Sequence, residues 1–105
     1  MADAAEQVKL LVTYDVHDGK QEEYFQFVLG EFVPAVQNMG LIMTEAWHTA
    51  YGEYPVRLAG FVADDYAKMA SILHNSEFLS LEERLKEYVF NYNRRVVPLR
   101  NGFQW

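Results

Sequence analysis

The first strongly patterned part of the chain alternates between apolar and other positions. From residue 8 to residue 16, apolar residues take every second place, at Val8, Leu10, Val12, Tyr14 and Val16. The places between them hold lysine, leucine, threonine and aspartate. A period of two is that of a β-strand, whose successive side chains point to opposite faces. The pattern therefore predicts a strand with one apolar face and one mixed face.

The period then changes to that of a helix. Between residues 20 and 40 the apolar residues recur at intervals of three and four, which places them on one helical face. Asp18 stands three residues before Gln21, the spacing of a capping box that would begin this helix. Pro34 must kink or restart the helix, because proline lacks an N–H donor and clashes with the preceding turn. Gly40 is suited to end it.

Two further strands are predicted at residues 41–51 and 56–63. A glycine and a proline punctuate the short segment between them, so the two strands form a hairpin. In the first of these strands His48 shares its parity with the small residue Ala46, while Trp47 takes the other parity. The hairpin therefore carries polar and aromatic side chains on both of its faces.

The last third of the chain predicts a second helix in two pieces and a final strand. Asp64 or Asp65 caps a helix that runs to about His74, and a short break follows. Ser80 opens another capping-box spacing, which predicts a further helical segment toward residue 90. Residues 91–99 then supply a short strand, which ends near a proline.

This order of elements predicts one domain over residues 1–105 with the ferredoxin-like βαββαβ fold. It is an α+β fold, in which an antiparallel four-stranded sheet carries helices on one face, here with an interrupted second helix. Both parities of the predicted strands hold apolar residues, including Leu11, Met43, Trp47 and Phe61. The second face of the sheet therefore also needs a cover, and we expect another sheet to provide it.

Composition narrows the choice of partners and of compartment. The formal net charge is −6, with 15 acidic and 9 basic residues, which argues against nucleic acid and anionic membranes as partners. The chain has no cysteine, which fits a reducing cytoplasm. No secretory signal precedes the first strand, and no apolar run is long enough to span a bilayer. We therefore expect a cytoplasmic protein.

From residue 8 to residue 99 the order of elements resembles the dimeric α/β-barrel superfamily, in which two ferredoxin-like subunits face their sheets to form a barrel. The superfamily includes stress-responsive A/B-barrel proteins, NIPSNAP-like proteins, muconolactone isomerases and antibiotic-biosynthesis monooxygenases. The resemblance implies a homodimer, or a higher oligomer built from it. The cofactor-free monooxygenases of this superfamily use tyrosine, tryptophan and asparagine side chains around a substrate that itself reacts with oxygen.

One local stretch can be compared with the stress-responsive group, whose polyketide cyclase members carry an apolar-apolar-His-Pro-x-His motif. The stretch "SILHNSEF" supplies the two apolar positions and His74. Asn75 replaces the proline, Glu77 replaces the second histidine, and Ser71 stands where the cyclase has a tyrosine. The match therefore includes His74 and leaves out the rest of the cyclase set.

Histidines, aromatic residues and arginines are the candidates for a small-molecule site. Imidazole titrates near neutrality, so His48 could act as acid or base, and its small neighbours leave room around the ring. Equally, His48 could be a hydrogen-bonded residue at an interface, and His74 a helix-terminal histidine favoured by the helix dipole. An arginine could anchor an anionic group. The candidates are His48 and His74 for catalysis, and Trp47, Tyr51, Arg57 and Arg94 for ligand binding.

Neither a metal nor a cofactor is predicted. The three histidines lack the spacings of metal-binding motifs, and the glycines form no phosphate-binding loop. Two functions remain open. One is the binding of a small hydrophobic or aromatic compound, which could extend to cofactor-free monooxygenase-, isomerase- or cyclase-like activity. The other is a non-catalytic, stress-related or regulatory homodimer with a packed interface. A cavity with convergent polar groups favours the first, and a filled interior favours the second.

Overall fold

The computed structural model of the chain describes residues 6–48 and 56–99, apart from the side chains of residues 45, 47, 48 and 56. The elements follow the predicted order of strand, helix, strand, strand, helix, strand, and both helices are subdivided. The strands are β1 (Val8–Val16), β2 (Ile42–His48), β3 (Val56–Ala63) and β4 (Val89–Pro98). The helical segments are α1 (Gln21–Phe27), η1 (Val28–Phe32), α2 (Val33–Asn38), α3 (Tyr66–Leu73) and α4 (Ser76–Leu85).

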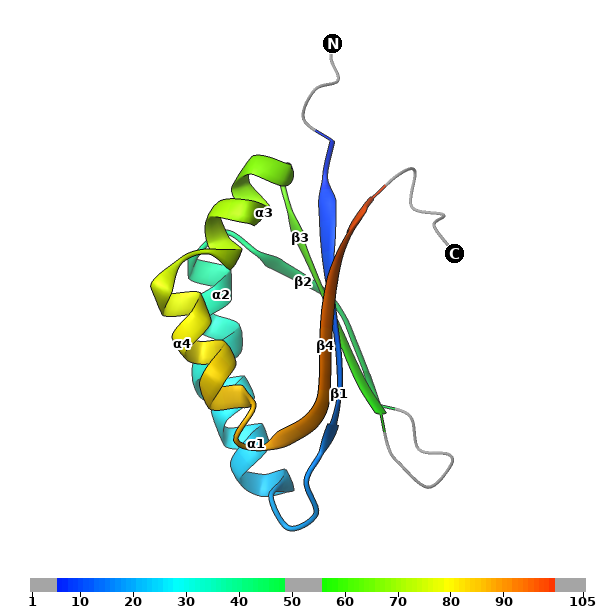
Figure 1. The fold of residues 1–105 in the computed structure, drawn as a ribbon, viewed down its shortest axis with the longest axis vertical. Helices are drawn as coiled ribbons and strands as arrows, with labels where there is room; N and C mark the ends of the chain where they lie inside the picture. Colours follow the sequence, from blue (N-terminus) through cyan, green and yellow to red (C-terminus); the bar gives the residue numbers. More distant parts are fainter. Residues whose placement is uncertain (1–5, 49–55, 100–105) are drawn as a thin grey trace.

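The four strands form one antiparallel sheet in the order β2-β3-β1-β4. The helices lie together on one face of this sheet, as Figure 1 shows. β1 and β3 occupy the centre, and β2 and β4 are the edges. This arrangement confirms the predicted ferredoxin-like α+β fold, and β1 has the predicted bounds. The predicted turn between β2 and β3 lies outside the described residues.

The first helix continues from α1 through η1 to α2, and its middle segment η1 is a π-helix. In a π-helix each N–H bonds to the carbonyl five residues earlier, which makes the turn wider than in an α-helix. Pro34 stands in the first turn of α2, where its ring would clash with the carbonyl four residues earlier in an ordinary α-helix. We therefore attribute the wider turn to this proline. The helix accommodates Pro34 by a local change of period.

Side-chain caps begin the two pieces of the second helix. Asp65 accepts a hydrogen bond from the backbone N–H three residues later at 2.8 Å, which confirms it as a cap. Asn75 accepts from the N–H two residues later at 2.7 Å and begins α4. Both predicted capping boxes are wrong. Lys20 begins α1 without a side-chain bond, because a turn separates Asp18 from the helix, and Ser80 lies inside α4 because Asn75 caps it earlier.

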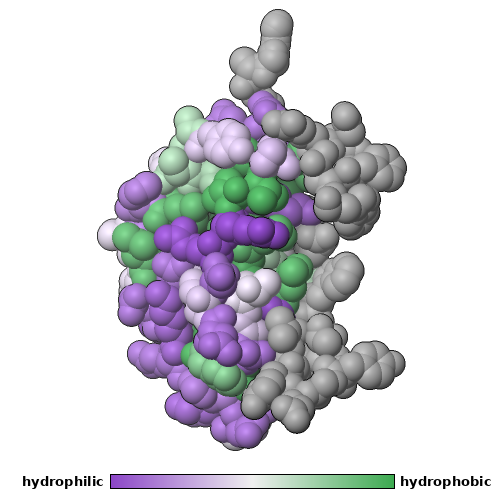
Figure 2. Space-filling model, turned by 45° about the vertical axis from the view of Figure 1, so that its right-hand side comes forward, coloured by the Kyte–Doolittle hydropathy of each residue, from purple (hydrophilic) through white to green (hydrophobic). Residues whose placement is uncertain are grey.

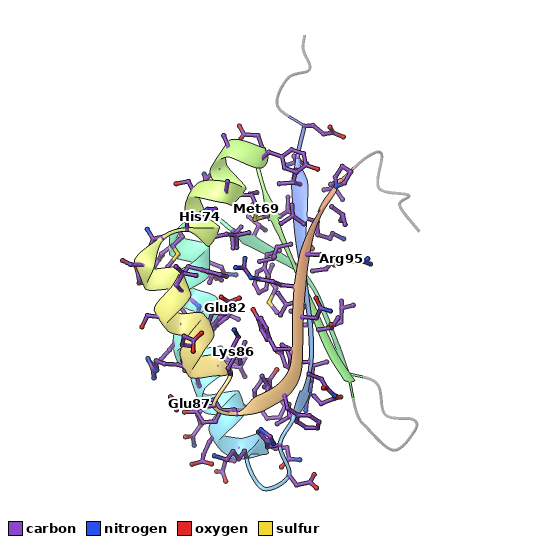
Figure 3. All side chains as sticks on the ribbon, viewed as in Figure 1. Met69, His74, Glu82, Lys86, Glu87 and Arg95 are labelled. Atoms are coloured by element: carbon purple, nitrogen blue, oxygen red, sulfur yellow. The ribbon has the colours of Figure 1, made fainter. Side chains whose placement is uncertain are left out.

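The sheet has an inner face toward the helices and an outer face away from them. Figure 2 turns the sheet partly toward the viewer and shows hydrophobic residues in the upper and middle part of the surface, among strongly hydrophilic ones. Figure 3 shows Met69 and Glu82 on the sheet side of α3 and α4, whereas Arg95 of β4 points away from the helices. Within the described residues, the helices therefore cover the inner face of the sheet and leave its outer face uncovered.

The core fills the layer between the inner face and the helices. β1 contributes the predicted parity, and Val8, Leu10, Val12 and Tyr14 are at most 5% exposed. Phe32 of the first helix has its ring centroid 6.4 Å from that of β3 residue 61 and 6.3 Å from that of α4 residue 78. The helices contribute the buried residues Tyr24, Phe27, Val28, Phe32, Val36, Met69, Ile72, Phe78, Leu81 and Leu85.

A β-bulge in β2 changes which of its residues face the helices. The register against β3 shifts between Met43 and Glu45, which leaves Thr44 as an extra residue. A bulge turns the residues beyond it to the face opposite to that given by strict alternation. Met43 and Ala46 therefore both line the inner side, although they are three residues apart. By strict alternation Ala46 would lie on the face opposite to Met43, and that expectation is wrong for this reason.

A second bulge lies in β4. The register against β1 shifts by one residue between the partners of Thr13 and Asp15, and Asn91 at this point has a φ of 55°. Asparagine tolerates this left-handed backbone better than most residues. Its side-chain amide also donates a hydrogen bond to Asp15 Oδ2 at 3.1 Å, which ties the bulge to β1. As a result, Val89 and Tyr92 both face the core although they are three residues apart.

Candidate functional site

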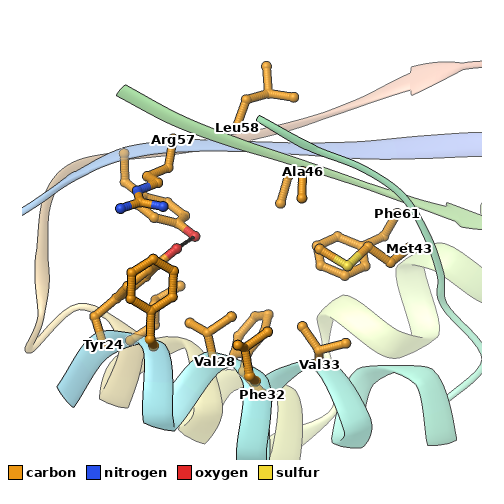
Figure 4. Close-up of a pocket in the computed structure, with 14 residues that line it drawn as sticks. Tyr24, Val28, Phe32, Val33, Met43, Ala46, Arg57, Leu58 and Phe61 are labelled. Atoms are coloured by element: carbon orange, nitrogen blue, oxygen red, sulfur yellow. Dashed lines mark hydrogen bonds between the residues drawn. The ribbon is translucent and has the colours of Figure 1, made fainter. Parts of the chain in front are cut away.

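A pocket of about 150 Å³ lies between the first helix and the inner face of the sheet. Figure 4 looks along it, with the helical segments on one side and the strands on the other. Most of the lining is apolar, and Ala46 and Ala59 leave space because their side chains are short. Cavities of about this volume with an apolar lining accommodate one benzene ring. The space therefore fits a compound of one ring.

One end of the pocket is entirely apolar. Phe32 and Val33 of the first helix face Met43 of β2 and Phe61 of β3 there, as Figure 4 shows. The bulge in β2 matters at this point, because it brings Ala46 to the same face as Met43. This end could bury the flat faces of a ring but offers it no hydrogen bond from a side chain.

The other end of the pocket is polar, and two tyrosines stand there. The hydroxyl oxygens of Tyr14 in β1 and Tyr24 in α1 lie 2.5 Å apart, and these residues are 5% and 4% exposed. Burial raises the pKa of both hydroxyls, because a tyrosinate would lose its hydration. Both are therefore protonated at neutral pH. One O–H is used in the bond between them, so the other can donate to a ligand.

Arg57 of β3 completes this polar end. Its guanidinium carbon lies 4.7 Å from the ring centroid of Phe25 and 5.4 Å from that of Tyr24. Attraction between a cation and a ring face, of order 1 kcal/mol, helps to hold it there. Arg57 Nε is buried and has no hydrogen-bond partner. Among the described residues, no carboxylate forms an ion pair with Arg57. The pocket thus combines a cation, a hydroxyl donor and an apolar chamber.

A second buried polar cluster packs against the tyrosine pair through the ring of Tyr92. Glu82 of α4 is 4% exposed and accepts hydrogen bonds from the Tyr92 hydroxyl at 2.7 Å and from Arg94 Nε at 2.8 Å. The Tyr92 ring lies nearly parallel to that of Tyr14, with the centroids 6.3 Å apart. Burial, and then the hydrogen bond to Glu82, raises the pKa of Tyr92. This cluster fixes the position of the Tyr14 ring beside the pocket.

Of the predicted site residues with described side chains, only Arg57 lines this pocket. Arg94 is bonded to Glu82 on the inner side of the sheet, so its guanidinium already has a carboxylate partner. His74 is the exposed C-cap of α3, and its Nδ1 lies 2.8 Å from the carbonyl oxygen of Ala70. The structure therefore does not bring His74 together with Arg57.

The other three predicted residues belong to the hairpin. His48 and Trp47 lie in β2, but their side chains fall outside the described part of the chain, and Tyr51 lies wholly outside it. In the register of the sheet, the backbone of His48 pairs with that of Arg57. This pairing puts position 48 at the strand end nearest the polar part of the pocket. The roles proposed for these three residues stay predictions.

Sequence reasoning missed Tyr14, Tyr24 and Glu82 as site residues. Both tyrosines fall on apolar stripes, where an aromatic ring is most simply explained as part of the core. The available signal was the hydroxyl itself, because a buried hydroxyl needs a hydrogen-bond partner. Glu82 follows Leu81, a residue of the predicted apolar stripe, and both are buried. A carboxylate near such a stripe indicates a donor close by, because a buried carboxylate requires one.

An open hollow of about 200 Å³ lies on the sheet's outer side. Its lining includes Leu11, Thr13, Leu58, Asn93 and Arg95. On β2, Ile42 is 63% exposed and pairs with Val62 of β3.

Within residues 6–48 and 56–99, no three His, Cys, Asp or Glu side chains are grouped to hold a metal ion. No helix in these ranges has the length and apolar character needed to cross a membrane.

No family model matches the sequence, and no curated protein matches it. Solved structures do share its fold. A NIPSNAP-domain protein from Burkholderia xenovorans is 15% identical with a TM-score of 0.67, over 86% of this chain and 91% of the other. A protein of unknown function from Bacteroides thetaiotaomicron, described as a possible oxidoreductase, is 12% identical with a TM-score of 0.69, over 90% and 99%.

A protein from Nitrosomonas europaea, named as a candidate antibiotic biosynthesis monooxygenase, is 10% identical with a TM-score of 0.65, over 93% of this chain and 92% of the other. Identities this low indicate a shared fold and carry no assignment of activity. The chain therefore has the ferredoxin-like α+β fold seen in NIPSNAP-domain and antibiotic-biosynthesis-monooxygenase-like proteins, which confirms the predicted resemblance at the level of the fold.

Proposed function

We propose that this protein binds a small hydrophobic or aromatic compound in the pocket between the first helix and the sheet. The supporting observation is an apolar, ring-sized space that ends at Arg57 and the Tyr14–Tyr24 pair. Ligand sites are typically apolar cavities with a few placed polar groups, and sites for drug-sized ligands hold about 300 to 1,000 Å³. At about 150 Å³, this pocket suits a smaller compound of about one ring.

A second candidate function is cofactor-free catalysis in the same pocket. The fold is shared with proteins described as a possible oxidoreductase and as a candidate monooxygenase, which favours this extension. The tyrosine pair would donate a hydrogen bond to an oxygen of the substrate. It would not act as a base at neutral pH, because burial raises the pKa of both hydroxyls. The base would then be His48, whose backbone pairs with that of Arg57.

A non-catalytic homodimer, stress-related or regulatory, is the remaining candidate. The exposed Ile42 and the outer hollow favour association through the outer face of the sheet. Analytical ultracentrifugation of the wild type and of Ile42→Asp tests this association. We expect a dimer that the aspartate weakens, because a carboxylate would lose its hydration at the interface. A monomeric wild type would exclude the homodimer.

Binding is tested by NMR titration with two neutral single-ring compounds, phenol and benzyl alcohol. Ala59→Leu should fill the pocket, while Ala67→Leu adds the same atoms to the exposed surface of α3 and serves as its control. We expect both compounds to shift pocket amides in the wild type and in the control but not in Ala59→Leu. Thermal denaturation verifies that both variants fold. The proposal is wrong if no single-ring compound, neutral or charged, shifts pocket amides of the wild type, or if Ala59→Leu binds as the wild type does.

A further inference from the structure

We infer that the ligand of this pocket carries a carboxylate on its ring, and that Arg57 and the remaining O–H of the Tyr14–Tyr24 pair bind this carboxylate. The inference rests on the proposed function, because it concerns the same pocket. It adds the chemical class of the ligand and its orientation: the carboxylate lies at the polar end, and the ring lies toward Met43 and Phe61 (Figure 4).

Arg57 differs from two other arginines with described contacts. Arg84 holds Glu31 through two hydrogen bonds of 2.7 and 3.1 Å, and Arg94 holds Glu82 at 2.8 Å. Within the described residues, the Arg57 guanidinium lies over the rings of Tyr24 and Phe25. The other two arginines each contact a carboxylate instead. Arg57 Nε is buried without an acceptor, although buried polar groups are rarely left without a partner. An anionic ligand in the pocket would give the Arg57 guanidinium a carboxylate partner like those of Arg84 and Arg94.

The shape of the polar end suits a carboxylate. A guanidinium is planar and presents parallel N–H donors, which match the two oxygens of a carboxylate. The tyrosine pair adds one O–H from a group that stays neutral, so it donates without adding charge. The guanidinium balances the single negative charge of the carboxylate, and the neutral O–H adds a further hydrogen bond. The apolar remainder of the lining then excludes a second charged group from the ring.

The net negative charge of the chain opposes the binding of anions, which makes a comparison of charged and neutral ligands informative. A net charge of −6 repels anions at long range, so a preference for an anion would have to arise locally. Benzoate and benzamide have nearly the same shape and differ in charge, and their comparison isolates the local effect. Arg57→Met removes the cation but keeps an apolar stem over the rings. Arg95→Met removes the same charge from an exposed residue of β4 and is the matched control.

The experiment is an NMR titration of the wild type and both variants with benzoate and with benzamide. We expect the wild type to bind benzoate at least about tenfold more tightly than benzamide, the scale of one charge-assisted hydrogen bond. Arg57→Met should lose this preference, because its affinity for benzoate falls to that for benzamide, and Arg95→Met should retain the preference. If Arg57→Met does not fold, Arg57→Gln replaces it with the same expectation.

The outcomes separate this inference from the proposed function. Equal affinity of the wild type for benzoate and benzamide would overturn the carboxylate assignment and leave the pocket as a binding site. A benzoate preference that survives in the Arg57 variant would also overturn it. If benzoate, benzamide and the neutral compounds all fail to shift pocket amides, both the inference and the proposed function are wrong.

Discussion

Replacement of Glu82 by glutamine should destabilise this protein strongly, although the two side chains have almost the same size. The carboxylate is nearly inaccessible to water and accepts hydrogen bonds from the Tyr92 hydroxyl at 2.7 Å and from Arg94 Nε at 2.8 Å. Glutamine retains one oxygen that can accept. This oxygen can take the place of Oε2, which accepts both bonds, but glutamine carries no charge to balance the Arg94 guanidinium.

The magnitude follows from how well the remaining charge can reach water. Removing one partner of a fully buried ion pair costs about 3 to 5 kcal/mol, because the other charge is left buried. The Arg94 side chain is 31% exposed, so it can recover part of its hydration. We therefore expect a loss of about 1.5 to 3 kcal/mol in the free energy of unfolding. This is a substantial part of the roughly 5 to 15 kcal/mol that stabilises an ordinary domain.

Urea denaturation followed by circular dichroism measures this loss. Glu83→Gln is the control, because Glu83 is the next residue, its side chain is 75% exposed, and it lies 3.6 Å from Lys86. The control should change the free energy of unfolding by less than about 0.5 kcal/mol. A double variant with Arg94→Met should lose less than the two single variants together, because no unpaired charge remains. If Glu82→Gln matches its control, the ion pair between Glu82 and Arg94 does not stabilise the fold.

Two further predictions concern ionisation and capping. Burial raises the pKa of Tyr14, Tyr24 and Tyr92 above the ordinary 10.0, so these tyrosines should leave the free energy of unfolding unchanged below about pH 9 and lower it above about pH 10, where only the unfolded chain releases their protons. Absorbance of tyrosinate tests this, and ionisation of all seven tyrosines together near the ordinary pKa would contradict it. Asp65→Ala should cost about 1 kcal/mol through loss of the cap of α3, while Asp64→Ala, whose side chain does not cap, should cost clearly less; equal losses would contradict the assignment.

Features that depend on local periodicity could be predicted from the sequence. The alternation from Val8 to Val16 reproduces β1, and the inner parity of that strand is the buried one. A cap at Asp64 or Asp65 was recognisable because these aspartates directly precede a helical stripe, and the structure shows Asp65 in this role. The order of strands and helices then limited the topology to one familiar arrangement. These predictions needed no knowledge of which distant residues meet.

Features that depend on pairing between distant elements could not be predicted. The extra residues at Thr44 and Asn91 are bulges only with respect to the partner strands, so alternation placed Ala46 on the wrong face. The Tyr14–Tyr24 hydrogen bond likewise joins a strand to a helix. Arg57 was predicted as an anion anchor from its residue type, and its position at the pocket appears only after the sheet is assembled.

The two bulges have a consequence for how copies of this protein can meet. Each lies in an edge strand, β2 or β4, and β4 also ends at a proline. An open antiparallel sheet with regular edges invites strands of other molecules to add, which leads to open-ended aggregates. Bulges and an edge proline interrupt the row of N–H and C=O groups that such growth requires. The bulge in β2, which shapes the pocket on the inner side, and the bulge in β4 therefore also make the edges of the sheet poor templates for added strands.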